Sequence, residues 1–158
     1  MILFAYGALL DIALLLKICP GSRTVGRARL LNHRLAFPTY SNSRAGGVSC
    51  VVPAPGHEVR GALYEIPDQE VPGLDAAHRV PEGRLVRERY LILGEDGRVE
   101  PADLYRAVKL QGDFPPARSY MDDMIRGARQ HALDPIYIQW LESLVGPTPD
   151  SRGARATQ

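Results

Sequence analysis

Residues 46–66 read GGVSCVVPAPGHEVRGALYEI, and this stretch decides the fold class. Two runs rich in β-branched and aromatic residues, 48–52 and 59–66, flank a segment that contains two prolines and Gly56. Such runs, separated by turn-forming residues, predict a β-hairpin. A second pair of runs, 85–93 and 99–108, flanks residues 94–97 and predicts another hairpin.

Working outward toward the N-terminus, residues 2–6 predict a short buried strand that ends at Gly7. Residues 8–18 then carry an apolar helical stripe before a Cys-Pro-Gly stop, which predicts a helix. Residues 25–37 predict a further strand, and the polar segment 39–47 predicts a loop. The order is therefore strand, glycine turn, helix, then a run of strands.

Toward the C-terminus the pattern becomes helical. Residues 67–79 predict a short helix, and the chain from Pro116 predicts one helix that ends near Leu133 and a second over 135–144. Strands in the first two thirds and helices in the last third predict an α+β domain over residues 1–146. Residues 147–158 are small and polar, and we expect a disordered tail.

Composition excludes several classes of function. The chain has 158 residues, 45% hydrophobic and 23% charged, with a net charge of +1, so no basic field favours a nucleic-acid partner. Two cysteines without metal-ligand spacing suit reduced thiols in the cytoplasm. The apolar opening carries Asp11 and Lys17 and is too short to span a bilayer, so we expect no membrane association.

Two loops could bind an anion. After Tyr6, the turn at Gly7, Ala8 and Leu9 would direct unpaired backbone N–H groups outward at the start of a helix, which suits a carboxylate. In the loop before residue 48, Arg44 could clamp a carboxylate in a bidentate way. Taken alone, each feature is more typical of an ordinary turn.

The titratable residues of the central region offer one candidate base. Among the set comprising Glu65, Glu70, Asp75, His78 and Glu82, only the histidine has an ordinary pKa near neutrality. A structural helix-end histidine is the alternative. The serines lack a GxSxG elbow and the other histidines lack zinc-ligand spacing, so serine hydrolases and metalloenzymes are disfavoured.

Several motifs, taken in order, carry a resemblance to a known family. They are FAYGALL (4–10), GRARLLNHRLAF (26–37), the stretch quoted above, LDAAHRV (74–80) and PPARSYMDDMIRGARQHAL (115–133). Together they resemble the γ-glutamylcyclotransferase family, whose members include AIG2-like proteins. The resemblance covers roughly residues 2–145.

The resemblance implies a small mixed β-barrel with flanking helices and a reaction that needs no cofactor or metal. A γ-glutamyl group would cyclise to 5-oxoproline, and an amine or amino acid would leave. The substrate-binding residues it implies are Tyr6, Gly7, Ala8, Leu9 and Tyr120, with Tyr105 as a further pocket tyrosine. Ala8 replaces a hydroxyl residue that is usual in the family, so only the backbone donors are retained there.

The main departure lies at LDAAHRV. His78 occupies the position of the family's catalytic glutamate, and Arg79 stands where glycine is usual. Two hypotheses follow. Either His78 serves as the acid/base of a γ-glutamyl cyclising enzyme, with Glu82 as a possible substitute, or the chain is a non-catalytic ligand-binding or regulatory module that keeps the pocket.

Overall fold

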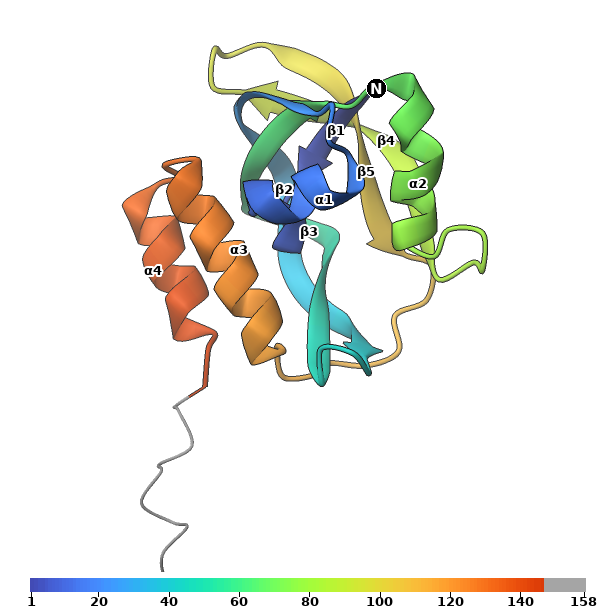
Figure 1. Cartoon of the computed structure of the whole chain (residues 1–158). Coiled ribbons are helices and arrows are strands. Elements are labelled where there is room, and N and C mark those ends of the chain that lie inside the picture. Colours follow the sequence, from blue (N-terminus) through green and yellow to red (C-terminus); the bar gives the residue numbers. More distant parts are fainter. Residues whose placement is uncertain (147–158) are drawn as a thin grey trace, which may run out of the picture.

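Five strands close into one barrel in the computed structural model, which describes residues 1–146 (Figure 1). The strands are β1 (Ile2–Ala5), β2 (Arg23–Ser41), β3 (Gly46–Glu65), β4 (Leu85–Gly94) and β5 (Val99–Ala107). Their order around the barrel is β1-β3-β2-β4-β5, and every pairing is antiparallel except β1 with β5. The prediction of an α+β chain with a small mixed barrel is therefore confirmed. The predicted tail, 147–158, lies outside the described residues.

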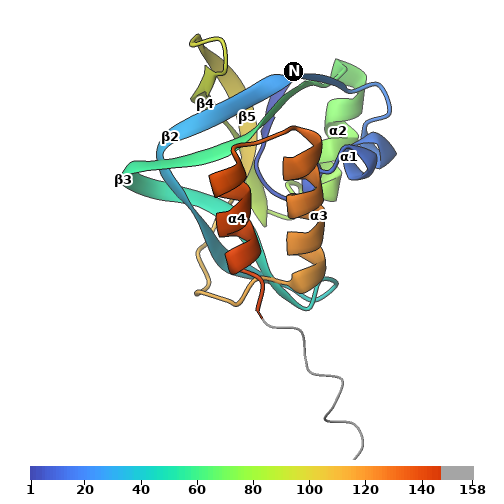
Figure 2. The same cartoon turned by 90° about the vertical axis from the view of Figure 1, so that its left-hand side faces the viewer.

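Helices flank the barrel on two sides. The short ones are η1 (Ala8–Leu10), α1 (Ile12–Ile18), η2 (Asp68–Glu70) and α2 (Val71–Ala77), and the last two are α3 (Arg118–Gln130) and α4 (Pro135–Ser143). Figure 2 shows α3 and α4 side by side against the barrel, with α1 and α2 beyond them. The apolar stripe of α3 faces inward, because Met121, Met124 and Ala128 are fully buried.

The hairpin predicted within residues 48–66 is wrong, whereas the β4–β5 hairpin is confirmed. Residues 46–65 form one continuous strand, β3, which pairs with β2 along almost its whole length. The prolines at 53 and 55 fall where β3 has no second neighbour, since β1 pairs only with residues 62–65. A proline that lacks an N–H is tolerated on such a free edge. The true hairpin turn lies earlier, at residues 42–45, within the predicted loop 39–47, whose flanks belong to β2 and β3.

The sequence predicts one helix over residues 8–18, but the structure has two separate helices there. A turn of 3-10 helix, η1, comes first, and α1 begins after Asp11, whose carboxylate accepts a hydrogen bond from the Ala13 N–H at 3.0 Å. An N-cap aspartate of this kind starts a new helix. Arg126 on α3 pairs with the same carboxylate at 2.7 Å and, although burial opposes the effect, this contact holds the pKa of Asp11 below its ordinary value.

The core contains both cysteines as free, buried thiols, as predicted. Among residues 1–146, no helix combines the length and the apolar character needed to cross a bilayer. Within the same residues, no group of three or more His, Cys, Asp or Glu side chains is arranged to hold a metal ion.

Candidate active site

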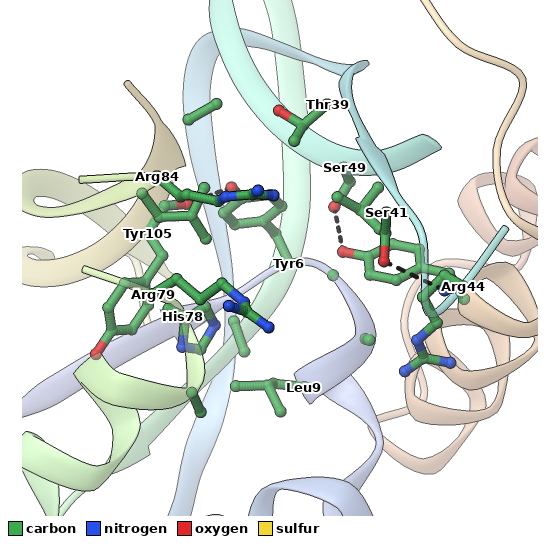
Figure 3. Close-up of a pocket in the computed structure, with 18 of the residues that line it drawn as sticks. Tyr6, Leu9, Thr39, Ser41, Arg44, Ser49, His78, Arg79, Arg84 and Tyr105 are labelled. Atoms are coloured by element: carbon green, nitrogen blue, oxygen red, sulfur yellow. Dashed lines mark hydrogen bonds between the residues drawn. The ribbon is translucent and has the colours of Figure 1, made fainter. Parts of the chain in front are cut away.

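One cavity of about 570 Å³ opens at the end of the barrel where β1, the β2–β3 turn, the loop after α2 and the start of α3 meet. Segments far apart in the sequence border it, and Figure 3 shows their side chains converging. All the predicted site residues line this cavity, together with Tyr105: Tyr6, Gly7, Ala8, Leu9, His78 and Tyr120. Their roles stay predictions, but the fold brings the residues together.

Gly7 lies directly against the Tyr120 hydroxyl. A Cβ built on Gly7 would overlap this hydroxyl and would lie only 2.9 Å from the Ser49 Oγ, so only glycine fits. The φ of Gly7 is −115°, so its freedom to turn is not the reason for glycine here. The expected N-terminus of a long helix is replaced by the three-residue turn η1, so any backbone donors at the pocket belong to this turn rather than to α1.

Tyr120 and Ser49 form a hydroxyl pair inside the cavity, with 2.7 Å between their oxygens. Burial raises the pKa of Tyr120, and the contacts with Ser49 and the backbone of Ala8 offset this only in part. The phenol therefore stays protonated at neutral pH and can donate a hydrogen bond to a carboxylate or to a developing oxyanion. Sequence reasoning missed Ser49, because a lone serine in a strand carries no motif.

His78 caps the C-terminus of α2 at the border of the cavity. Its Nδ1 lies 2.9 Å from the Leu74 carbonyl oxygen, which can only accept, so Nδ1 carries the proton of the neutral ring. Nε2 is then an unprotonated base with no protein partner among residues 1–146. Burial lowers the pKa of His78, while the Leu74 carbonyl and Asp75 partly oppose this effect, so the imidazole is neutral at pH 7.

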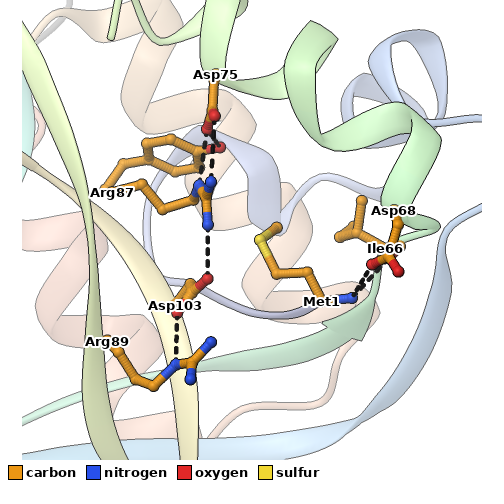
Figure 4. A network of polar contacts seen from close by, with 8 residues as sticks. Met1, Ile66, Asp68, Asp75, Arg87, Arg89 and Asp103 are labelled. Atoms are coloured by element: carbon orange, nitrogen blue, oxygen red, sulfur yellow. Dashed lines mark hydrogen bonds and ion pairs between the residues drawn. The ribbon is translucent and has the colours of Figure 1, made fainter.

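Tyr105 fixes the plane of that imidazole. The two rings stack with centroids 3.8 Å apart and an angle of 3° between them. The Tyr105 hydroxyl donates to the Asp75 carboxylate at 2.6 Å, and Arg87 holds the same carboxylate at 2.9 Å. Figure 4 shows this network continuing through Arg87 to Asp103, which is buried. Burial raises the pKa of Tyr105 and the Asp75 contact raises it further, so this hydroxyl stays a donor.

Tyr6 presents its aromatic ring, and not its hydroxyl, to the cavity. The hydroxyl is buried and donates a hydrogen bond to the backbone carbonyl of Tyr105 on the neighbouring strand β5. Desolvation raises the pKa of Tyr6 well above its ordinary value. A ligand in the cavity therefore meets the aromatic ring of Tyr6, while its polar atom is already satisfied.

The charged residues that line the cavity are all arginines, Arg44, Arg79 and Arg84, and no aspartate or glutamate joins them within the described part of the chain. Arg44, which sequence reasoning favoured as a solvated side chain, instead pairs with Asp123 on α3 at 2.6 Å and lies 5.6 Å from the centre of the Tyr120 ring.

Among residues 1–146, the acidic members of the predicted titratable set do not line the cavity. Glu65 pairs with Arg23, and Glu70 accepts from the Gly21 N–H. Glu82 is exposed and does not line the cavity, so it lies away from the place where a substitute base is needed. Among residues 1–146, only His78 presents a base that titrates near neutrality to the cavity, and its ring stacks on Tyr105, whose hydroxyl donates to Asp75.

A small closed β-barrel carries this cavity, whose lining combines apolar side chains with tyrosines, arginines and an uncharged imidazole. Comparisons with known proteins identify the fold. A solved structure described as a gamma-glutamyl cyclotransferase matches with a TM-score of 0.88 at 22% identity, over 96% of this chain and 90% of that one. The uncharacterized human protein loc79017 gives a TM-score of 0.86 at 22% identity, over 94% and 93%. A mouse AIG2-like protein gives 0.52 at 18% identity, over 76% and 81%.

A match to a protein-family model assigns the chain to a family. The AIG2-like family model matches residues 58–141, which is more than half of the chain. A comparison with curated protein sequences found no match. The chain belongs to the AIG2-like family and has the γ-glutamyl cyclotransferase-like fold.

Proposed function

We propose that this protein cyclises a γ-glutamyl compound to 5-oxoproline and releases the attached amine or amino acid, with His78 as the acid/base. The observation that carries the proposal is the His78 imidazole at the cavity, whose Nδ1 is bound to the Leu74 carbonyl and whose Nε2 is left as a base. Membership of the AIG2-like family and the cyclotransferase-like fold support this choice of reaction.

The reaction is an intramolecular aminolysis. The substrate's α-nitrogen attacks its own γ-carbonyl carbon, one C–N bond forms in the five-membered lactam, and the C–N bond to the leaving nitrogen breaks. Two protons leave the α-ammonium and two are gained by the leaving nitrogen, so the reaction is balanced without a co-reactant. A neutral Nε2 can accept a proton from the first nitrogen and return it to the second.

The remaining polar groups suit the demands of that reaction. The η1 turn and the Tyr120 hydroxyl would bind the substrate's α-carboxylate, and the close fit of Gly7 against Tyr120 would hold the glutamyl chain folded. Holding the amine close to its own carbonyl supplies much of the rate, because the reacting groups are already in one molecule.

The first test is product formation. Purified protein is incubated with γ-glutamyl dipeptides, glutathione and γ-glutamylamines, and 5-oxoproline is measured by mass spectrometry. We expect release from at least one of these compounds. No 5-oxoproline from any compound of the panel would contradict the proposal.

The pH dependence of kcat/KM gives a second prediction. Burial lowers the pKa of His78 below its ordinary value of 6.5, so the base is fully available at neutral pH and is lost only as the pH falls through that lowered pKa. The acid limb of the pH profile should have its midpoint below 6.5. A midpoint above that value, or a flat profile down to pH 4.5, would exclude His78 as the base.

Ligand binding without turnover is the second candidate function. The observation that favours it is that no carboxylate of residues 1–146 lines the cavity, so none of these residues would stabilise the substrate's α-ammonium by charge there. A rise in Tm with γ-glutamyl compounds or 5-oxoproline, in samples that form no product, would support this candidate, because a ligand that binds only the folded state stabilises it.

A further inference from the structure

The arginines of the cavity carry an inference about the leaving half of the substrate, and this inference rests on the proposed function. Three arginines and no acidic residue line the cavity within residues 1–146. Of these, Arg44 is already paired with Asp123, so its charge is largely compensated. Arg79 and Arg84 have no ion pair and no side-chain hydrogen bond with any residue that the structure describes, and they are the uncompensated charges at the site.

Arg79 and Arg84 belong to the turn between α2 and β4, and the backbone holds them together. The Arg84 N–H donates to the Arg79 carbonyl at 3.1 Å, and the Val108 N–H donates to the Arg84 carbonyl at 3.1 Å. Figure 3 shows both side chains on the His78 side of the cavity, across from Ser49 and Arg44. Two arginine side chains therefore line the cavity from a turn that is tied to the edge of the barrel.

The backbone of Arg79 is strained. Its φ is +51°, in the left-handed region that is unfavourable for a residue with a side chain and that glycine adopts freely. An arginine in such a conformation, beside a cavity and without a side-chain partner among residues 1–146, points to a ligand contact. Nothing in the packing of the turn needs this side chain, because Arg79 is exposed.

The position of this pair identifies which part of the substrate it meets. The Tyr120 hydroxyl lies 2.7 Å from the Ser49 hydroxyl, and Ser49 lies across the cavity from Arg79 and Arg84 (Figure 3). Tyr120 would hold the glutamyl half there. We propose that Arg79 and Arg84 together bind the two carboxylates of an acidic leaving residue, so that the preferred substrates release an acidic amino acid rather than a neutral amino acid or a cationic amine. Guanidinium groups bind carboxylates with paired hydrogen bonds, and they repel ammonium groups.

A pair of substrates of nearly equal shape tests the proposed carboxylate binding by Arg79 and Arg84. γ-Glutamyl-glutamate and γ-glutamyl-glutamine differ by one carboxylate, and we expect kcat/KM to favour the first by roughly fivefold to tenfold, mainly through KM, because both arginines are exposed to solvent. In Arg79→Gly and in Arg84→Met the preference should fall, and in the double variant it should vanish. Raised salt should weaken the preference in the unaltered protein.

Arg98→Met is the matched control, since Arg98 lies in the β4–β5 turn and does not line the cavity, yet its loss changes the net charge equally. The Tm of Arg79→Gly should equal or exceed that of the unaltered protein, because the strain is relieved. Equal kcat/KM for the two substrates, or a preference that persists in the double variant, would overturn the inference.

Failure of the proposed function is distinguishable from failure of this inference. If neither compound yields 5-oxoproline, the cyclisation proposal fails, and the Tm shift given by each compound is compared instead. A larger shift with γ-glutamyl-glutamate that disappears in the double variant would still support the carboxylate site. Equal shifts with both compounds would refute the site as well.

Discussion

Replacing His78 with alanine is expected to lower kcat for 5-oxoproline formation by about 100-fold or more, with the fold retained. The imidazole is the only titratable base that the structure places at the cavity among residues 1–146, and its Nδ1 bond to Leu74 leaves Nε2 as the proton acceptor. The side chain is half-buried at a helix end, so its removal should cost little stability. The measurement is kcat with a saturating γ-glutamyl dipeptide, alongside circular dichroism.

Two further variants sharpen this prediction. Glu82→Gln is the matched control, because Glu82 lies on the same turn but is exposed and does not line the cavity, and its activity should be unchanged. His78→Glu should retain more activity than the alanine variant and should shift the acid limb of the pH profile toward the carboxylate range. Full activity in His78→Ala, or loss in Glu82→Gln alone, would move the catalytic role away from His78.

Gly7→Ala is expected to reduce activity by about 100-fold, since a displacement of the order of 1 Å in a positioning group can cost this much. The added methyl group would overlap the Tyr120 hydroxyl and approach the Ser49 Oγ to 2.9 Å, so the hydroxyl pair must move. Gly26→Ala is the control, because no atom lies within 4 Å of a Cβ built there.

Tyr120→Phe separates the loss of the hydroxyl from the steric clash. It removes the hydrogen bond to Ser49 without adding an atom beside Gly7. We expect a smaller loss of activity than in Gly7→Ala, because the ring and the space around it are retained. A Gly7→Ala variant with unaltered kinetics would show that this close contact does not position the substrate.

The sequence predicted the fold class because alternating β-rich runs and the C-terminal helical stripes are local patterns. It did not predict that residues 46–65 form one strand, because prolines normally end strands and their tolerance at 53 and 55 depends on a free edge that only the barrel defines. The break at Asp11 was equally hidden, since the apolar stripe continues through it and the cap becomes evident only with Arg126 opposite.

The candidate site was also predicted from the sequence only in part. The family motifs placed Tyr6, His78 and Tyr120 as candidates, and all three line one cavity. Two of the contacts that set their chemistry join residues distant in sequence: Ser49 meets Tyr120 across 71 positions, and Tyr105, which stacks on His78, donates to Asp75 across 30 positions. Nor could composition reveal that Arg79 and Arg84 face the cavity uncompensated, because the whole chain is nearly neutral.

An isomer comparison tests the central claim most directly. γ-Glutamyl-glutamate and α-glutamyl-glutamate have the same atoms, but only in the first can the α-amine close a five-membered ring and expel the second residue. The account predicts that the unaltered protein converts the γ-linked isomer into equal amounts of 5-oxoproline and glutamate, leaves the α-linked isomer intact, and loses this activity in His78→Ala. An intact γ-linked isomer, or equal conversion by the unaltered protein and the alanine variant, would contradict it.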